Sequence, residues 1–260
     1  MDLLGQALTK FDLFWLIAFR ISGIFYAAPI FGTRYVPAQW KIGFSLLLSL
    51  IVLPLVPAPP GGIPGELLAW LMVAAKELGV GLLIGMISNL LFIAVQTGGQ
   101  LLDQEMGFGI TNVLDPQSGT SLPMIGNFQY LLALLIFLTM NGHHFLLAAV
   151  VRSLQAIPVG GSSLSGPLYE VVLGSFSNMF LTAVKLIAPV MGALFLTNVA
   201  LGFMARAVPQ MNVFMVGMPA KVIIGMLVIA AGLPMYLLTV ERLSSELFRE
   251  ILGIIQRLKP

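Results

Sequence analysis

The chain has 260 residues, of which 58% are hydrophobic and only 9% are charged. Soluble domains carry roughly 25% charged residues, so 13 Lys+Arg and 11 Asp+Glu cannot cover a water-exposed surface of this size. The composition excludes a soluble enzyme. It also excludes a disordered chain, which has few apolar residues and many charges. We expect a membrane protein or a chain buried in a membrane-bound assembly.

Net charge and cysteine content exclude two further classes. The formal net charge of +2 is too small to indicate binding to nucleic acid. The chain has no cysteine, which rules out disulfides and cysteine-based metal sites.

Six long apolar runs alternate with short polar segments. They cover residues 13–31, 42–56, 67–95, 124–151, 171–205 and 213–240. A membrane helix needs about 20 mostly apolar residues, and the runs lack the apolar–polar alternation of barrel strands. We therefore predict an all-α, membrane-associated fold, with a single domain over residues 1–260.

Prolines lie in or at the edge of these runs, at Pro29, Pro54, Pro189, Pro219 and Pro234. Proline removes a helical hydrogen bond and kinks the helix, and in lipid the freed carbonyl must find a protein partner. The prolines therefore favour kinked helical hairpins packed against other protein. The alternative is that prolines are simply commoner in membrane helices.

The positive-inside rule gives conflicting assignments for this chain. Arg34 and Lys41 mark the first loop as cytoplasmic. Strict alternation of six spans then places the basic C-terminal tail outside. Either one run does not span, or the protein does not sit in lipid as hydropathy assumes. The tail itself, residues 241–260, is predicted to be an amphipathic helix for a partner or a membrane surface, and its apolar face comprises Leu243, Leu247, Ile251, Ile254 and Leu258.

Signatures of catalysis are missing from the sequence. It contains no H-E-x-x-H, G-x-S-x-G, Walker or G-x-G-x-x-G motif. The only histidines, His143 and His144, are adjacent, and neighbours on a helix point about 100° apart, so we expect a helix cap rather than a metal site. We predict no catalytic residues, no metal and no cofactor.

Five charged residues interrupt the apolar runs, and charges at membrane depth are costly. They form either a proton or ion relay or structural ion pairs and interface contacts. We favour ion pairs, because relays use Asp, Glu and His whereas four of these five are basic. The residues are Arg20, Lys76, Glu77, Lys185 and Lys221.

A GxxxG spacing at Gly81 and Gly85 lets helix backbones approach closely. We expect this pair to pack against a helix of another subunit.

Residues 107–123 combine helix breakers with apolar side chains. Glycines and prolines such as Gly107 and Pro116 prevent a continuous helix, yet Phe108, Ile110 and Leu114 make the segment too apolar for an exposed loop. Irregular backbone at membrane depth is tolerated only where protein buries it or it lines a wet cavity. The segment is a candidate pore plug or gate; the alternative is an ordinary buried re-entrant loop.

Four stretches of sequence resemble one family. Residues 206–221, RAVPQMNVFMVGMPAK, are the most specific; residues 28–37, 99–116 and 141–144 agree. The chain resembles the FliR family, an export-gate component of the bacterial flagellar type III secretion apparatus. This resemblance covers essentially the whole chain.

The resemblance implies a non-enzymatic role in the inner membrane, within the flagellar basal body. A single FliR-like chain assembles with several FliP and FliQ subunits and, with FlhB and FlhA, forms the gate for unfolded flagellar subunits. The implied fold is a bundle of kinked hairpins, a FliP-like part followed by a FliQ-like part, held largely above the plane of the membrane lipid. In this family the loop at 107–123 acts as the channel plug, and its residues here are Gly107, Phe108, Gly109, Ile110, Asn112, Val113, Leu114, Asp115, Pro116 and Pro123.

The turn at residues 206–221 has two interpretations. Arg206, Gln210, Asn212 and Lys221 hold the turn between two long helices and meet neighbouring subunits, or Pro209 and Asn212 only cap the adjacent helices. Rival functions are the equivalent subunit of a virulence injectisome and a small secondary transporter. The paired similar halves that are typical of such transporters are missing.

Overall fold

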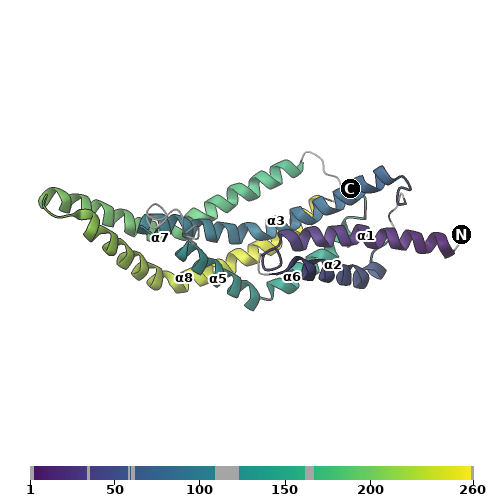
Figure 1. The fold of residues 1–260 in the computed structure, drawn as a ribbon, viewed down its shortest axis with the longest axis horizontal. Coiled ribbons are helices and arrows are strands. Elements are labelled where there is room, and N and C mark those ends of the chain that lie inside the picture. Colours follow the sequence, from purple (N-terminus) through teal and green to yellow (C-terminus); the bar gives the residue numbers. More distant parts are fainter. Residues whose placement is uncertain are drawn as a thin grey trace. The chain divides into compact units, whose positions relative to one another are not determined.

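The computed structural model describes residues 3–33, 36–57, 59, 62–108, 123–161 and 167–258. These parts of the chain are helical and contain no strand, which confirms the all-α prediction (Figure 1). The elements are α1 (Leu3–Ala27), α2 (Ala38–Val52), the 3-10 turn η1 (Leu53–Leu55), α3 (Leu67–Met106), α5 (Met124–Thr139), α6 (Gly142–Ala156), α7 (Pro167–Ala207) and α8 (Val213–Arg257).

Within the described residues, four segments are long and apolar enough to cross a membrane, or five if α5 and α6 form one span. The fourth apolar run is two helices, because Asn141 adopts the left-handed backbone conformation with φ 58°. Pro189, Pro219 and Pro234 lie inside α7 and α8 rather than ending them.

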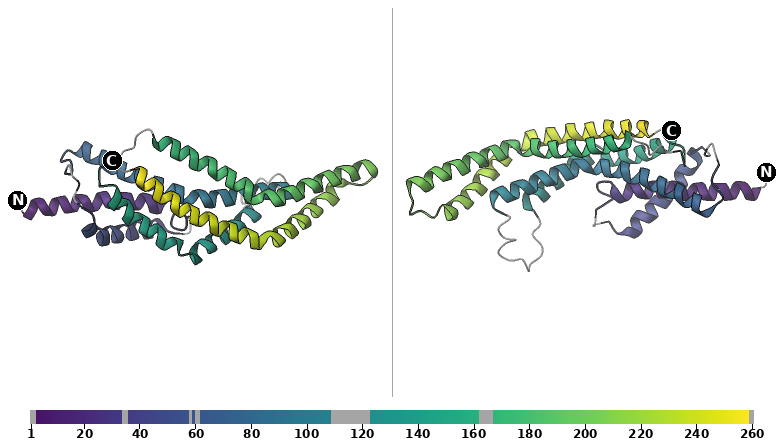
Figure 2. Two further views of the ribbon diagram at one scale, coloured as in Figure 1. Left: turned by 180° about the vertical axis from the view of Figure 1, so that it is seen from behind. Right: turned by 90° about the horizontal axis from the view of Figure 1, so that it is seen from above.

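The sixth apolar run and the predicted tail helix form one continuous helix, α8, of 45 residues (Figure 2). From the sequence, the apolar face of the tail is expected to contact a partner or a membrane surface. This expectation is wrong, because the face is covered by the chain itself. Leu247, Ile251, Ile254 and Leu258 are all buried within the chain. Phe248 of the same stretch stacks on Phe145 of α6, with ring centroids 4.1 Å apart.

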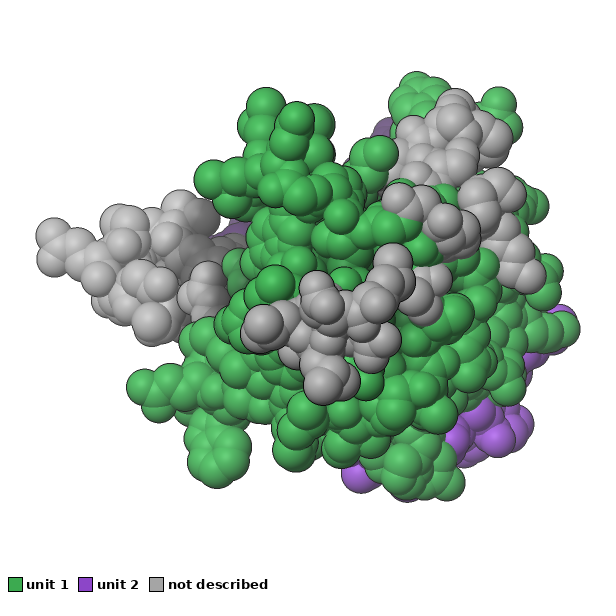
Figure 3. Space-filling view, turned by 90° about the vertical axis from the view of Figure 1, so that its right-hand side faces the viewer, with its two compact units in different colours: residues 1–90, 141–176, 244–260 green, residues 91–140, 177–243 purple. Residues whose placement is uncertain are grey.

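The chain divides into two compact units, coloured separately in Figure 3. Unit 1 comprises residues 1–90, 141–176 and 244–260; unit 2 comprises residues 91–140 and 177–243. Each unit is assembled from segments that are distant in the sequence, so neither is a contiguous domain. The expected division into a FliP-like and a FliQ-like part stays a prediction.

Unit 1 is organised around a close contact between α1 and α3. A Cβ on Gly81 would overlap the carbonyl oxygen of Arg20, and one on Gly85 would lie 2.6 Å from the carbonyl oxygen of Ile24. The GxxxG face is therefore filled by α1 of the same chain, and this corrects the expectation that Gly81 and Gly85 pack against another subunit.

Unit 2 has an apolar core where the C-terminal end of α3 meets α5, α7 and α8. Leu102 and Met106 of α3 are fully buried there, together with Leu194 of α7. Phe108 and side chains of α8 pack against this core. The start of residues 107–123 thus leaves directly from a packed apolar cluster.

Candidate functional site

Helix α3 ends in a Schellman motif at the start of the candidate plug. The Gly107 N–H donates to the Gln104 carbonyl at 3.2 Å, and the Phe108 N–H donates to the Asp103 carbonyl at 2.9 Å. This pair of hydrogen bonds places a residue with positive φ after the helix, and Gly107 has φ 92°. The geometry gives Gly107 a local role that a residue with a Cβ fills only under strain.

The two ends of residues 107–123 are tied together by the side chain of Asp103, which is 4% exposed. Its carboxylate accepts hydrogen bonds from the Ile125 N–H at 2.9 Å and the Gly126 N–H at 3.1 Å. These are free N–H groups in the first turn of α5, where a negative charge is favoured. Gly99 approaches Gly126 so closely that a Cβ on Gly99 would overlap it. We call residues 103–108 together with 123–126 the plug root.

Of the predicted plug residues, the structure describes only Gly107, Phe108 and Pro123. Phe108 is partly buried against the core of unit 2, and Pro123 immediately precedes α5. The remaining predicted residues lie outside the described parts of the chain: Gly109, Ile110, Asn112, Val113, Leu114, Asp115 and Pro116.

A cavity of about 450 Å³ lies beside the plug root. Its lining combines the end of α3 with α7 and α8, and it contains few polar groups. Those groups are contributed by Gln104, Glu105, Asn198 and Lys221. The sequence predicted Lys221 as an interface residue, and the structure places it within unit 2, partly buried at this cavity.

The turn between α7 and α8 exposes the other residues predicted there. Arg206, Pro209, Gln210 and Asn212 are exposed. Asn212 precedes α8, and its side-chain oxygen accepts a hydrogen bond from the Met215 N–H at 3.3 Å. This is the helix-capping geometry of the second interpretation. It leaves Arg206, Pro209 and Gln210 free to contact other proteins.

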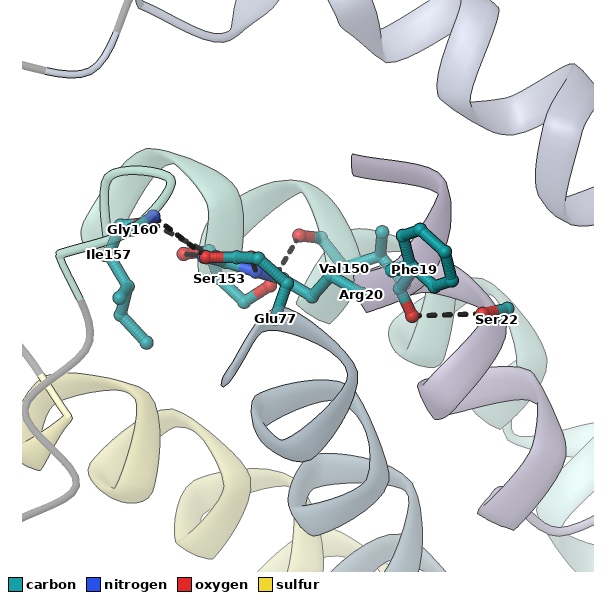
Figure 4. Close-up of polar contacts among 8 residues, drawn as sticks. All are labelled: Phe19, Arg20, Ser22, Glu77, Val150, Ser153, Ile157 and Gly160. Atoms are coloured by element: carbon teal, nitrogen blue, oxygen red, sulfur yellow. Dashed lines mark hydrogen bonds and ion pairs between the residues drawn. The ribbon is translucent and has the colours of Figure 1, made fainter. Parts of the chain in front are cut away.

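A buried ion pair joins three helices of unit 1 (Figure 4). Arg20 of α1 donates from Nε to Glu77 of α3 at 2.5 Å, and both side chains are 0% exposed. Arg20 Nη1 also donates to the carbonyls of Ser153 and Ile157, at 2.9 and 3.0 Å. A cation at the end of a helix stabilises its unpaired carbonyls, so Arg20 caps the C-terminal end of α6.

Glu77 completes this polar cluster with its second oxygen. Glu77 Oε1 accepts a hydrogen bond from the Gly160 N–H at 2.9 Å (Figure 4). The structural ion pair favoured from sequence is therefore confirmed for Arg20 and Glu77, whereas Lys76 and Lys185 are exposed. His143 and His144 lie in the first turn of α6, with ring centroids 4.2 Å apart.

Sequence reasoning missed the clamp formed by Asp103. Its signal was the position of the residue, because an anion in the last turn of a helix is unfavourable unless another group compensates it. The pairing of Arg20 with the α6 carbonyls was not predictable, because 133 residues separate Arg20 from Ser153.

The chain is similar to bacterial export proteins over most of its length. Residues 11–247 match the family described as "Bacterial export proteins, family 1". The chain is 38% identical to the flagellar biosynthetic protein FliR of Bacillus subtilis, over 97% of this chain and 99% of that protein. It is 30% identical to FliR of Escherichia coli, over 97% and 96%, and 30% identical to FliR of Aquifex aeolicus, over 93% of each.

The fold and the family match define a bacterial export protein with several membrane-spanning-capable helices. The chain belongs to the FliR family of flagellar biosynthetic proteins, within the bacterial export proteins of family 1.

Proposed function

We propose that this chain is a non-enzymatic subunit of the flagellar type III export gate in the bacterial inner membrane. In this proposal it lines a protein-conducting channel together with FliP and FliQ subunits, next to FlhB and FlhA, and residues 107–123 plug the channel. Unfolded flagellar subunits are the cargo. The proposal rests on the membership of the FliR family and on the two features argued below.

The exposed apolar surface of α7 is the observation that carries the assembly part of the proposal. Large apolar side chains are exposed from Leu173 to Met204, which is about 46 Å along a helix that rises 1.5 Å per residue. The hydrocarbon core of a bilayer is about 30 Å thick, and a helix tilted by about 40° crosses it in about 39 Å. A lipid bilayer alone would leave part of this length uncovered, which supports cover by protein partners.

Partner subunits are also supported by the poor burial of α8. Only 6% of its most apolar 18-residue window is buried within the chain, compared with 61% for α3. Exposed side chains on α8 include Phe214, Ile223, Leu227 and Leu238. Exposed patches of this extent mark surfaces that contact other proteins or the membrane, and α8, at 45 residues, is longer than the roughly 20 residues that one span needs.

The plug part of the proposal is supported by the geometry of the plug root. Asp103 holds the first turn of α5 close to the last turn of α3, so residues 107–123 leave and return at nearly one point. A semi-apolar segment closed at its base in this way is suited to insertion into a channel without disturbing the helices that carry it.

Assembly is tested by exchanging one exposed apolar side chain. Phe203, 71% exposed on α7, is replaced with Glu, and the tagged chain is purified from its host in mild detergent. We expect the partner subunits to be lost from the purified particle. The matched control is Gln155→Glu at an exposed position of α6, which should leave the particle intact. Equal recovery of partners with both variants would contradict the proposed surface.

The plug is tested by replacing residues 109–122 with a shorter Gly/Ser linker. We expect the complex to assemble and small solutes to leak across the inner membrane. The control replaces residues 162–166, another short connecting segment, with a Gly/Ser segment of equal length and should not leak. An unchanged permeability of the 109–122 variant in an assembled complex would exclude the plug.

A further inference from the structure

One face of α8 is packed against the end of α3 from which the proposed plug leaves. Met218, Val222, Gly225 and Ile229 recur at intervals of four, three and four residues, so they lie along one face of the helix. Val222 and Ile229 pack on the core of unit 2. Gly225 contacts Met106, the last residue of α3, and Met218 contacts Gly107, the residue after it.

Gly225 provides the space that Met106 occupies. Met106 is 0% exposed, and a Cβ on Gly225 would lie 2.8 Å from its Cε and 2.9 Å from its Sδ. Real Cβ atoms do not show such distances, so a larger residue at position 225 must displace the end of the flexible Met106 side chain. Met106 immediately precedes Gly107, so a substitution at position 225 acts on the residue directly before the proposed plug.

Met218 contacts Gly107, the residue that follows Met106. Its Cε lies 3.3 Å from the position of a Cβ on Gly107. Between the two contact points lies Pro219, which is exposed and has no N–H for a helical hydrogen bond. Next to the contact face, α8 therefore lacks one backbone hydrogen bond.

We propose that Met218 and Gly225 are positioning residues for the plug: they fix the start of residues 107–123 by holding Met106 and Gly107. This inference rests on the proposed function of the segment. It identifies α8 as the helix that fixes the position of Met106 and Gly107 at the end of α3. Met218 lies within residues 206–221, the stretch that most specifically resembles the family.

The test measures solute leak through assembled complexes, normalised to the amount of complex. Met218→Ala is expected to raise the leak about fivefold, which corresponds to about 1 kcal/mol in favour of a displaced segment. Met218→Leu, which keeps a large apolar side chain, should restore the low leak. Met215→Ala is the matched control, because Met215 lies one turn earlier on α8 and is exposed.

A second variant and a combined variant separate the possible failures. Gly225→Ala displaces Met106 without touching Met218 and should leak like Met218→Ala. In the chain whose residues 109–122 are replaced, Met218→Ala should add no further leak. If that replaced chain leaks but neither single variant does, the positioning role is wrong while the plug stands. If the replaced chain itself does not leak, both the plug and its positioning are wrong.

Discussion

Removing one partner of the buried ion pair should destabilise unit 1 strongly. Glu77→Gln retains the size of the side chain but leaves the fully buried Arg20 without its counter-charge. Breaking a buried pair in this way costs about 3–5 kcal/mol. For a chain of this size, roughly 2–4 °C in Tm is lost per kcal/mol, so we expect a decrease of about 6–20 °C.

Replacing both partners should cost less than replacing one. In Arg20→Met/Glu77→Met no unpaired charge remains, and apolar packing offsets part of the loss. The carbonyls of Ser153 and Ile157 and the Gly160 N–H each still lose one hydrogen bond, at about 1 kcal/mol each, although the Ser153 carbonyl keeps its bond from the Ile157 N–H. The double variant should therefore unfold at a temperature between Glu77→Gln and the parent chain.

The assay is thermal unfolding of the purified chain in detergent, followed by tryptophan fluorescence. Trp70 reports on this region, because its ring lies 6.1 Å from that of Phe19, which is adjacent to Arg20. Lys76→Gln is the matched control: Lys76 is adjacent to Glu77 in sequence but exposed. A Glu77→Gln variant that unfolds within error of Lys76→Gln would refute the reasoning.

Three further predictions follow from the described contacts. Gly81→Val should lower the free energy of unfolding by about 1–3 kcal/mol, because its Cβ overlaps the α1 backbone; Gly79→Val, whose Cβ would have no neighbour within 4 Å, should unfold like the parent in the same fluorescence assay. Asp103→Ala should cost about 1–2 kcal/mol, the usual loss of a helix cap, and should raise solute leak; a parental leak would contradict its role at the plug root. Changing His143 and His144 together to Asn should leave motility nearly intact, and a non-motile strain with a normally assembled complex would show that their role was underestimated.

The helical fold was predictable from the sequence because apolar runs of this length have few alternatives. The runs located every long helix in the described parts of the chain, and the prolines in α7 and α8 lie within helices, as the sequence allowed. The break at Asn141 was not predicted, because a left-handed residue inside an apolar run produces no strong compositional signal. The sequence also did not predict that the apolar face of residues 241–260 is buried within the same chain. Amphipathicity shows that a helix face is covered but not what covers it.

Contacts between distant segments explain most of what the sequence left open. The Gly81 face suits any close helix, and only the fold shows that α1 occupies it. The candidate plug was found from its composition, whereas the clamp at its base depends on Asp103 reaching N–H groups 22 and 23 residues away. Charge and spacing thus indicated which residues were unusual, and the folded chain determined their partners.

The central claim is that this chain works as one subunit of a larger export gate. The most direct test is purification of the tagged chain from its native host in mild detergent, followed by mass spectrometry of the intact particle. The account predicts a large complex that contains FliP-like and FliQ-like partners. A clean monomer or homodimer from cells that are assembling flagella would contradict it and would favour a self-sufficient transporter.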